Sequence, residues 1–250
     1  MGNSLKLINF PKAFPLGLLV SIMFFLTMFC LNKPNADMTS TVISLVAGLV
    51  CFILFLVSYV ALDRCMATEL IVQENGEDGL SFKEIFADVR YYFAPFTALV
   101  VLFVIAYTIL IPTIGSVAGS IFQVDIAGFN FNILTLFINF CFLIWLFVGT
   151  AEIVSMDIGF IDTITYTFGF VFDHLAKVAG FLVLLAFLAL VFNFILLTTN
   201  GGSQVLMMPV KVLAFAYLFS LLNASAISLF INNVEEDDFD DAEEYDEDEE

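Results

Sequence analysis

Long apolar runs separated by short polar stretches dominate the sequence. Six runs have uncharged centres and are long enough to cross about 30 Å of hydrocarbon as helices. They cover residues 13–31, 41–62, 93–112, 131–153, 178–198 and 209–231. We expect an all-α fold, a polytopic transmembrane bundle of about six spans. The first run is too long for a signal-peptide core and no small-residue cleavage site follows it, so we expect it to be retained.

Composition supports the same class. The chain is 61% hydrophobic and only 14% charged, with a mean hydropathy of +1.00, whereas a water-soluble domain is roughly 25% charged. This excludes a soluble globular protein.

Lys and Arg in the short loops predict the orientation. The basic residues expected on one side are Lys6, Lys12, Arg64, Lys83, Arg90 and Lys177, against Lys33 and Lys211 on the other. We therefore expect a multi-pass cell-membrane protein with both termini in the cytoplasm, and with loops 63–92 and 154–177 on that side. The opposite loop, 113–130, contains three glycines and is expected to be a tight, partly re-entrant segment.

The two cytoplasmic loops resemble each other, which predicts an internal repeat. Aligning 67–93 with 150–172 matches Glu69 with Glu152, Phe82 with Phe160, Glu84 with Asp162, and Ile85 with Thr163. Each unit reads as a span, an acidic exit, an amphipathic helix and a second span. We expect a transmembrane domain over 1–233 that contains a duplication of 41–112 and 131–198.

The amphipathic segments predict two helices lying in the inner membrane interface. The expected apolar faces at helical spacing are Phe82, Ile85, Phe86 and Val89 in the first helix, and Phe160, Ile164 and Phe168 in the second. Ser81, followed by Glu84, forms a capping-box signature at the start of the first helix.

These two segments also carry a family resemblance. The strings GLSFKEIFADVRYYF and GFIDTITYTFGFVF, each followed by an apolar span, resemble prokaryotic integral-membrane families around the membrane domain of glycerophosphodiester phosphodiesterase and related domains of unknown function. The resemblance covers roughly 41–231 and implies a six-span prokaryotic membrane scaffold. It transfers no catalytic residue, because the phosphodiesterase barrel is absent. The second copy also departs from the family pattern, with Lys177 as its one basic residue.

Residues able to carry chemistry are few. The single histidine, His174, follows Asp173, and Cys30, Cys51, Cys65 and Cys141 are scattered without a metal-binding or redox motif. No phosphate loop, dinucleotide fingerprint or Ser-His-Asp set occurs. We expect no cofactor, no metal, no nucleic-acid partner and no enzymatic activity.

Three acids at the inner ends of spans two and four form a possible polar site: Asp63, Glu69 and Glu152. Ionisable groups near lipid are costly and often functional. The matching repeat positions of Glu69 and Glu152 strengthen this hypothesis. The alternative is that each charge marks the end of a span and reaches water.

The net charge of −18 belongs mainly to the last residues. Segment 234–250 holds 13 of the 26 acids and no base, so the remaining chain carries 13 acids against 8 bases, a net of −5. We expect a disordered acidic cytoplasmic tail. It could be a solubilising brush, a cation-binding segment, or a docking site for a basic protein with Phe239 and Tyr245 as anchors.

Two functions follow from these features. The first is a non-enzymatic accessory or scaffold subunit that associates with other membrane proteins, or with itself, and presents the acidic tail. The alternative is a small transporter or lipid-handling protein with a site near Glu69 and Glu152.

Overall fold

The structure is a computed structural model that describes residues 12–31, 38–75, 80–118, 123–126, 129–156, 158–199 and 204–247. The helices are α2 (Ala13–Leu31), α3 (Met38–Asn75), α4 (Phe82–Ala118), α5 (Ile133–Met156), α6 (Phe160–Asp173), α7 (Leu175–Thr199) and α8 (Gln204–Glu247). Among these described helices, six are long and apolar enough to cross a membrane, all but α6. The multi-pass helical membrane fold expected from the sequence is confirmed.

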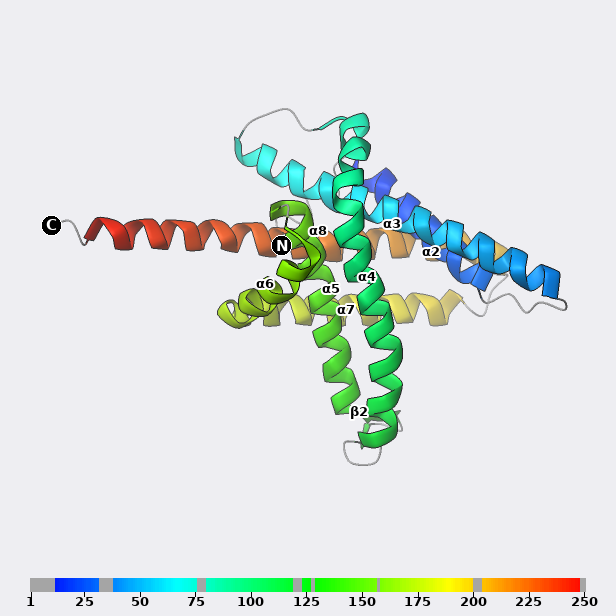
Figure 1. The fold of residues 1–250 in the computed structure, drawn as a ribbon. Helices are drawn as coiled ribbons and strands as arrows, with labels where there is room; N and C mark the ends of the chain where they lie inside the picture. The colour runs from blue at the N-terminus through cyan, green and yellow to red at the C-terminus, as the bar shows by residue number, and fades with distance from the viewer. Residues whose placement is uncertain are drawn as a thin grey trace.

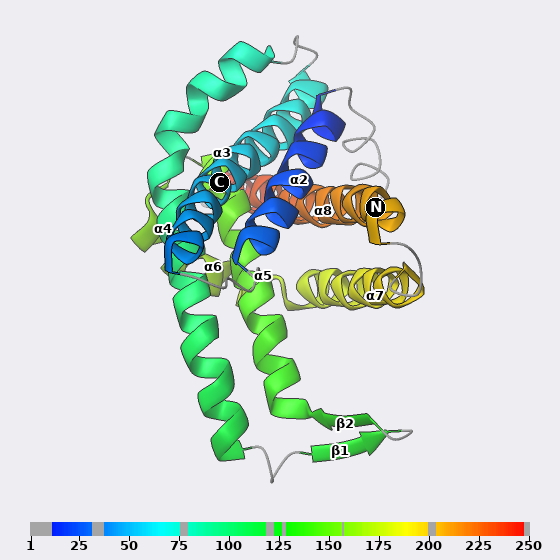
Figure 2. The same ribbon diagram turned by 90° about the vertical axis from the view of Figure 1, so that its right-hand side faces the viewer.

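The spans pack as three helical hairpins, α2–α3, α4–α5 and α7–α8, and α8 also contacts α2, α3 and α5. The hairpins converge at one end and splay at the other. In Figure 1, α4 and α5 run at a steep angle to α7 and α8, and Figure 2 shows the same separation from the side. Because the hairpins diverge, their apolar side chains cannot fill the space between them equally along its length.

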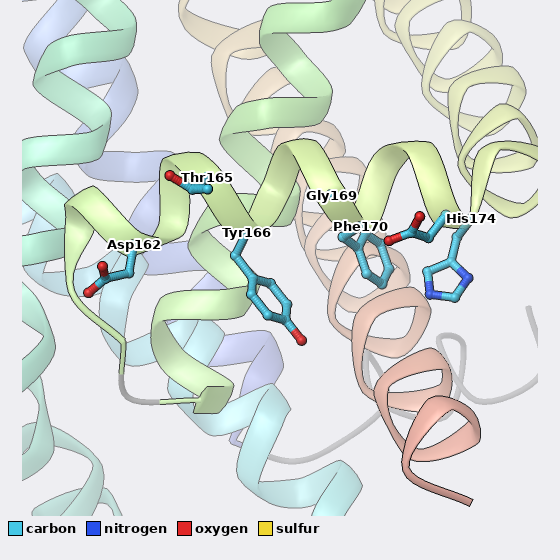
Figure 3. A pocket seen from close by; sticks show the side chains of 7 residues that line it. Asp162, Thr165, Tyr166, Gly169, Phe170 and His174 are labelled. Carbon is cyan, nitrogen blue, oxygen red and sulfur yellow. The ribbon is translucent and has the colours of Figure 1, made fainter. Parts of the chain in front are cut away.

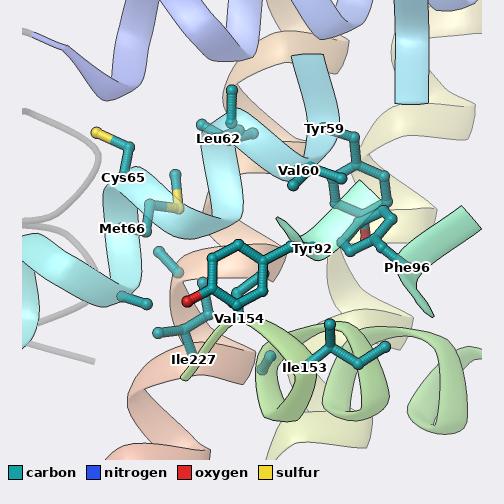
Figure 4. Packing of buried hydrophobic residues seen from close by; sticks show 14 of the residues in the cluster. Tyr59, Val60, Leu62, Cys65, Met66, Tyr92, Phe96, Ile153, Val154 and Ile227 are labelled. Carbon is teal, nitrogen blue, oxygen red and sulfur yellow. The ribbon is translucent and has the colours of Figure 1, made fainter. Parts of the chain in front are cut away.

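Burial follows this convergence. Most residues in the second half of α3, from Leu56 to Leu70, are buried, whereas Val42, Leu45 and Leu49 in its first half are exposed. The main core cluster therefore lies where the hairpins meet, and Figure 4 shows part of it, with α3 side chains packed against α4, α5 and α8. An apolar side chain exposed at the splayed end faces lipid at no cost.

Two glycines permit close approaches between helices. A Cβ atom on Gly17 of α2 would collide with the Ser220 hydroxyl of α8, and one on Gly149 of α5 would lie 2.9 Å from a Leu99 methyl of α4. Small residues at such crossings let backbones approach closely, which is how helices associate in a bilayer.

The first predicted interfacial helix is not a separate element. Residues 82–92 form the first turns of α4, which continues without a break into the span. Pro95 lies inside this helix, and proline bends a helix because it removes one hydrogen bond. The first turns of α4 lean away from the rest of the helix (Figure 2). The predicted capping box is present, since Ser81 Oγ and N each lie within 2.7 Å of Glu84 Oε2.

Burial confirms only part of the predicted apolar faces. In the first turns of α4, Ile85 and Val89 are buried, but Phe82 and Phe86 are 44% and 43% exposed. The second helix, α6, is a separate element between two spans, as expected.

The face of α6 differs more strongly from the prediction. Phe168 is 58% exposed, and Phe160 and Ile164 are only partly buried, whereas Thr163, Thr167 and Phe170 are buried. The prediction placed the apolar side inward, which is correct for a helix beside water. Here a polar stripe faces a buried acid and the apolar stripe faces outward.

Loop 113–130, expected to be a tight, partly re-entrant segment, instead contains the end of a helix and part of a β-hairpin. Helix α4 extends to Ala118, and β1 (Gln123–Ile126) pairs antiparallel with β2 (Phe129–Asn132) in a short hairpin at the end of α4 and α5 (Figure 2). This hairpin is an addition to the expected all-α fold.

The acidic segment also differs from the prediction. Helix α8 continues through it to Glu247, so the segment expected to be disordered is helical to that residue. Extending an existing helix avoids the cost of a new nucleus. The side chains of Phe239 and Tyr245 lie outside the described residues, and their role as anchors stays a prediction.

Candidate functional site

The three acids singled out from the sequence are all buried. Asp63 and Glu69 on α3 are 1% and 3% exposed, and Glu152 on α5 is fully buried. None of them is a charge at the surface that marks the end of a span. They do not form one constellation either, because each has different neighbours.

Glu69 belongs to a structural ion pair. Its Oε1 lies 3.3 Å from Lys12 Nζ, which also donates to the carbonyl of Leu80. Lys12 directly precedes α2, and Leu80 lies two residues before the start of α4. This contact therefore joins the beginnings of two helices to α3, and it leaves Glu69 with a charged partner.

Glu152 binds the short helix α6. Its Oε2 accepts a 2.7 Å hydrogen bond from Thr167 Oγ1 on α6, and that hydroxyl also contacts the carbonyl of Thr163. Within the described part of the chain, Glu152 Oε1 has no hydrogen-bond partner. The buried acid explains why the polar stripe of α6 faces inward.

Asp63 is the least satisfied of the three. Neither carboxylate oxygen has a hydrogen-bond partner of normal geometry among the described residues. The Thr150 hydroxyl is near enough for a weak hydrogen-bonding contact with Asp63, and the Tyr59 hydroxyl interacts with it electrostatically. The hydrogen bond of normal geometry from Thr150 Oγ1, however, goes to the carbonyl of Phe147, at 3.1 Å. A buried carboxylate without donors is costly.

The neighbouring base does not compensate Asp63. Arg64 points toward α4 and α5, where its Nε lies 3.2 Å from Asp88 Oδ2 and one terminal nitrogen donates to the carbonyl of Val154 at 3.0 Å. Its guanidinium also stacks 5.1 Å from the centre of the Tyr92 ring. The positive charge of Arg64 is therefore paired with Asp88 and not with Asp63.

Tyr59 lies one helical turn before Asp63, on the same face of α3. Its hydroxyl donates to Asn223 Oδ1 on α8 at 3.1 Å. Its ring makes edge contacts with Phe96 and Phe219, with centroids 4.8 and 4.9 Å away. Figure 4 shows Tyr59 and Phe96 packed together beside Val60. Tyr59 is therefore fixed at both its ring and its hydroxyl.

An apolar pocket lies next to Tyr59, on the side away from Asp63. It has a volume of about 250 Å³, and apolar atoms alone form its surface. It lies between α2, α3, α4, α5 and α8, where the hairpins begin to splay. The lining residues are Phe24, Thr27, Met28, Phe52, Phe55, Tyr59, Val100, Phe103, Val104, Leu146, Phe215 and Phe219.

A second hollow runs along α6 and is larger, about 480 Å³. Figure 3 shows that Asp162 and His174 lie at opposite ends of it, with Tyr166 and Phe170 between them. Its side chains are spread along one helix rather than converging on a point. The His174 ring packs against Phe170, with centroids 4.7 Å apart.

Among the described residues, no three His, Cys, Asp or Glu side chains group as metal ligands would. The four cysteines are free thiols. The expectations of no metal, no cofactor and no enzymatic activity stay predictions.

Sequence reasoning found Asp63 but missed Tyr59 and the pocket. Tyr59 is one aromatic residue in a chain with 31 phenylalanines, so it does not stand out alone. The available signal was spacing: Phe52, Phe55, Tyr59 and Asp63 follow one another at intervals of three or four residues. Such a stripe lies on one helix face and ends in an acid.

The chain matches no protein-family model, no curated protein sequence and no solved structure. The resemblance to the phosphodiesterase membrane domain, the internal repeat and the prokaryotic origin therefore stay predictions.

Proposed function

We propose that this protein is a lipid-handling membrane protein that binds the apolar chain of an amphiphile between its helical hairpins. The observation that carries the proposal is the aromatic-lined pocket, which lies where the hairpins splay and ends against Tyr59, whose hydroxyl is bonded to Asn223. Ligand sites in proteins combine an apolar cavity with a few placed polar groups. Repeated and bundled membrane helices commonly hold substrates between them.

The pocket volume fits part of a ligand rather than a whole one. Sites for drug-sized molecules have volumes of about 300–1,000 Å³, and this pocket, at about 250 Å³, is slightly smaller. A single alkyl chain extending from the bilayer needs only a narrow cavity of this kind. An apolar lining without exposed polar atoms favours such a chain over a sugar, a nucleotide or an ion.

This proposal moves the site away from where the sequence placed it. The lipid-handling alternative put the site near Glu69 and Glu152, but Glu69 is paired with Lys12 and Glu152 with Thr167. The scaffold function and the orientation of the termini stay predictions. An outward apolar face such as that of α7 contacts lipid or a protein partner equally well.

Filling the pocket should weaken binding. Val100 lines the pocket and is 5% exposed, whereas its neighbour Val101 faces outward and is 38% exposed. In Val100→Trp the indole occupies the space of the ligand chain. Losing the burial of two methylene groups costs about 1.6 kcal/mol, so we expect at least about a tenfold rise in Kd.

The measurement is saturable binding of tritiated dodecanol to the protein in nanodiscs, by scintillation proximity with empty discs as background. Val101→Trp is the matched control and should bind like the wild type. Thermal unfolding of both variants verifies that they are folded. Equal binding by a folded Val100→Trp variant and by Val101→Trp would contradict the proposal.

A further inference from the structure

We infer that the amphiphile carries a protonated amine, and that Asp63 is the carboxylate that binds it. This inference rests on the proposed function and names its ligand class. It is carried by a buried acid without a partner, placed at the end of the stripe of α3 residues that lines the pocket.

Asp63 continues the face of α3 that lines the pocket. Phe52, Phe55 and Tyr59 line the pocket on α3, and Asp63 is the next residue on that face. One helical turn, about 6 Å along the axis, separates Tyr59 from Asp63. A ligand with its chain against Phe52 and Phe55 therefore directs its other end past Tyr59 toward Asp63.

The two carboxyl oxygens of Asp63 lack hydrogen-bond donors among the described residues. Asp63 is 1% exposed, and both its oxygens lack a hydrogen-bond partner in the described part of the chain. Native proteins satisfy buried polar atoms in nearly every case. A ligand group with several N–H donors satisfies these two oxygens, and a group without donors does not.

The charged side chains at this end of the bundle favour a cationic ligand. Described basic side chains with ion pairs at this end of the bundle are Lys12, with Glu69, and Arg64, with Asp88. Asp63 and Glu152 are both acids and neither has a basic partner among the described residues. A cation therefore complements Asp63, whereas an anionic head group would be repelled.

Tyr59 separates the pocket from Asp63. Its hydroxyl is held by Asn223, and its ring by Phe96 and Phe219. For the head group to reach Asp63, the bond between Tyr59 and Asn223 must open. The amine then lies between the tyrosine hydroxyl and the acid, while the Tyr59 ring stays against Phe96 and Phe219 and the alkyl chain lies in the aromatic pocket.

The experiment compares three ligands with one chain length in the nanodisc binding assay: dodecylamine, dodecanol and dodecyltrimethylammonium. The wild type should bind dodecylamine most tightly, at least about tenfold more tightly than the quaternary ammonium, which has the charge but no donor. Asp63→Asn should remove this preference. The substitution preserves shape and replaces the carboxyl group with a neutral amide, which is cheaper to bury than a carboxylate, so the variant is expected to fold.

Asp162→Asn on the exposed side of α6 is the matched control and should keep the preference. If all three ligands bind, Val100→Trp weakens them, and Asp63→Asn leaves the amine preference unchanged, the inference is overturned while the proposed function stands. A tighter affinity for dodecanol than for dodecylamine in the wild type would also overturn the amine class. If no ligand binds saturably, or Val100→Trp has no effect, the proposed function itself fails.

Discussion

Lys12→Met is expected to lower the free energy of unfolding by about 3–5 kcal/mol, because it leaves a buried acid without its partner. The Glu69 side chain is 4% exposed, and the ion pair with Lys12 spans 3.3 Å. Methionine retains the apolar stem of lysine, so the loss comes from the charge and from the hydrogen bond to the carbonyl of Leu80.

The double variant Lys12→Met/Glu69→Gln separates this effect from a general loss of packing. Removing both charges should restore much of the lost stability, since a neutral amide is far cheaper to bury than a carboxylate. The measurement is unfolding in mixed micelles by titration with a denaturing detergent. Strictly additive losses in the single and double variants would show that the pair does not act as a unit.

Tyr59→Ala should have the second large effect, a loss of about 3–5 kcal/mol. The substitution deletes a ring that is 2% exposed and packs between Phe96 and Phe219, and it leaves Asn223 Oδ1 without its donor. Tyr59→Phe keeps the ring and should cost about 1–3 kcal/mol, the penalty of the unsatisfied amide.

The control for this series is Tyr107→Ala. Tyr107 is on α4 and 39% exposed, so its removal leaves no closed cavity and should cost less than about 1 kcal/mol. Similar losses at both positions in the same detergent titration would contradict the view that Tyr59 is a fixed element between the pocket and the polar cluster.

The spans could be predicted from the sequence because the hydrocarbon thickness sets their length and excludes charge. The importance of Asp63, Glu69 and Glu152 could also be predicted, since acids next to apolar runs are rare. Their partners could not. Lys12 and Glu69 are 57 residues apart, and only the packing of the start of α2 against α3 brings them together.

Other errors came from assuming that water lies on the polar side of every helix. The apolar face predicted for α6 included Phe168, which faces outward because Thr167 is bound to Glu152. The pocket could not be predicted from the sequence either. It arises from the angle between the hairpins, and that angle depends on contacts such as Gly17 against Ser220 rather than on any one segment.

The central claim is that the pocket beside Tyr59 holds the alkyl chain of an amphiphilic amine. Photo-crosslinking with an alkylamine that carries a diazirine in its chain, followed by peptide mass spectrometry, tests it most directly. We expect the modified residues to lie on α3 between Phe52 and Tyr59 and on α8 near Phe215 and Phe219, and we expect excess dodecylamine to suppress them. Labelling confined to outward faces, such as Val183 and Phe187 of α7, and insensitive to the competitor would contradict the claim.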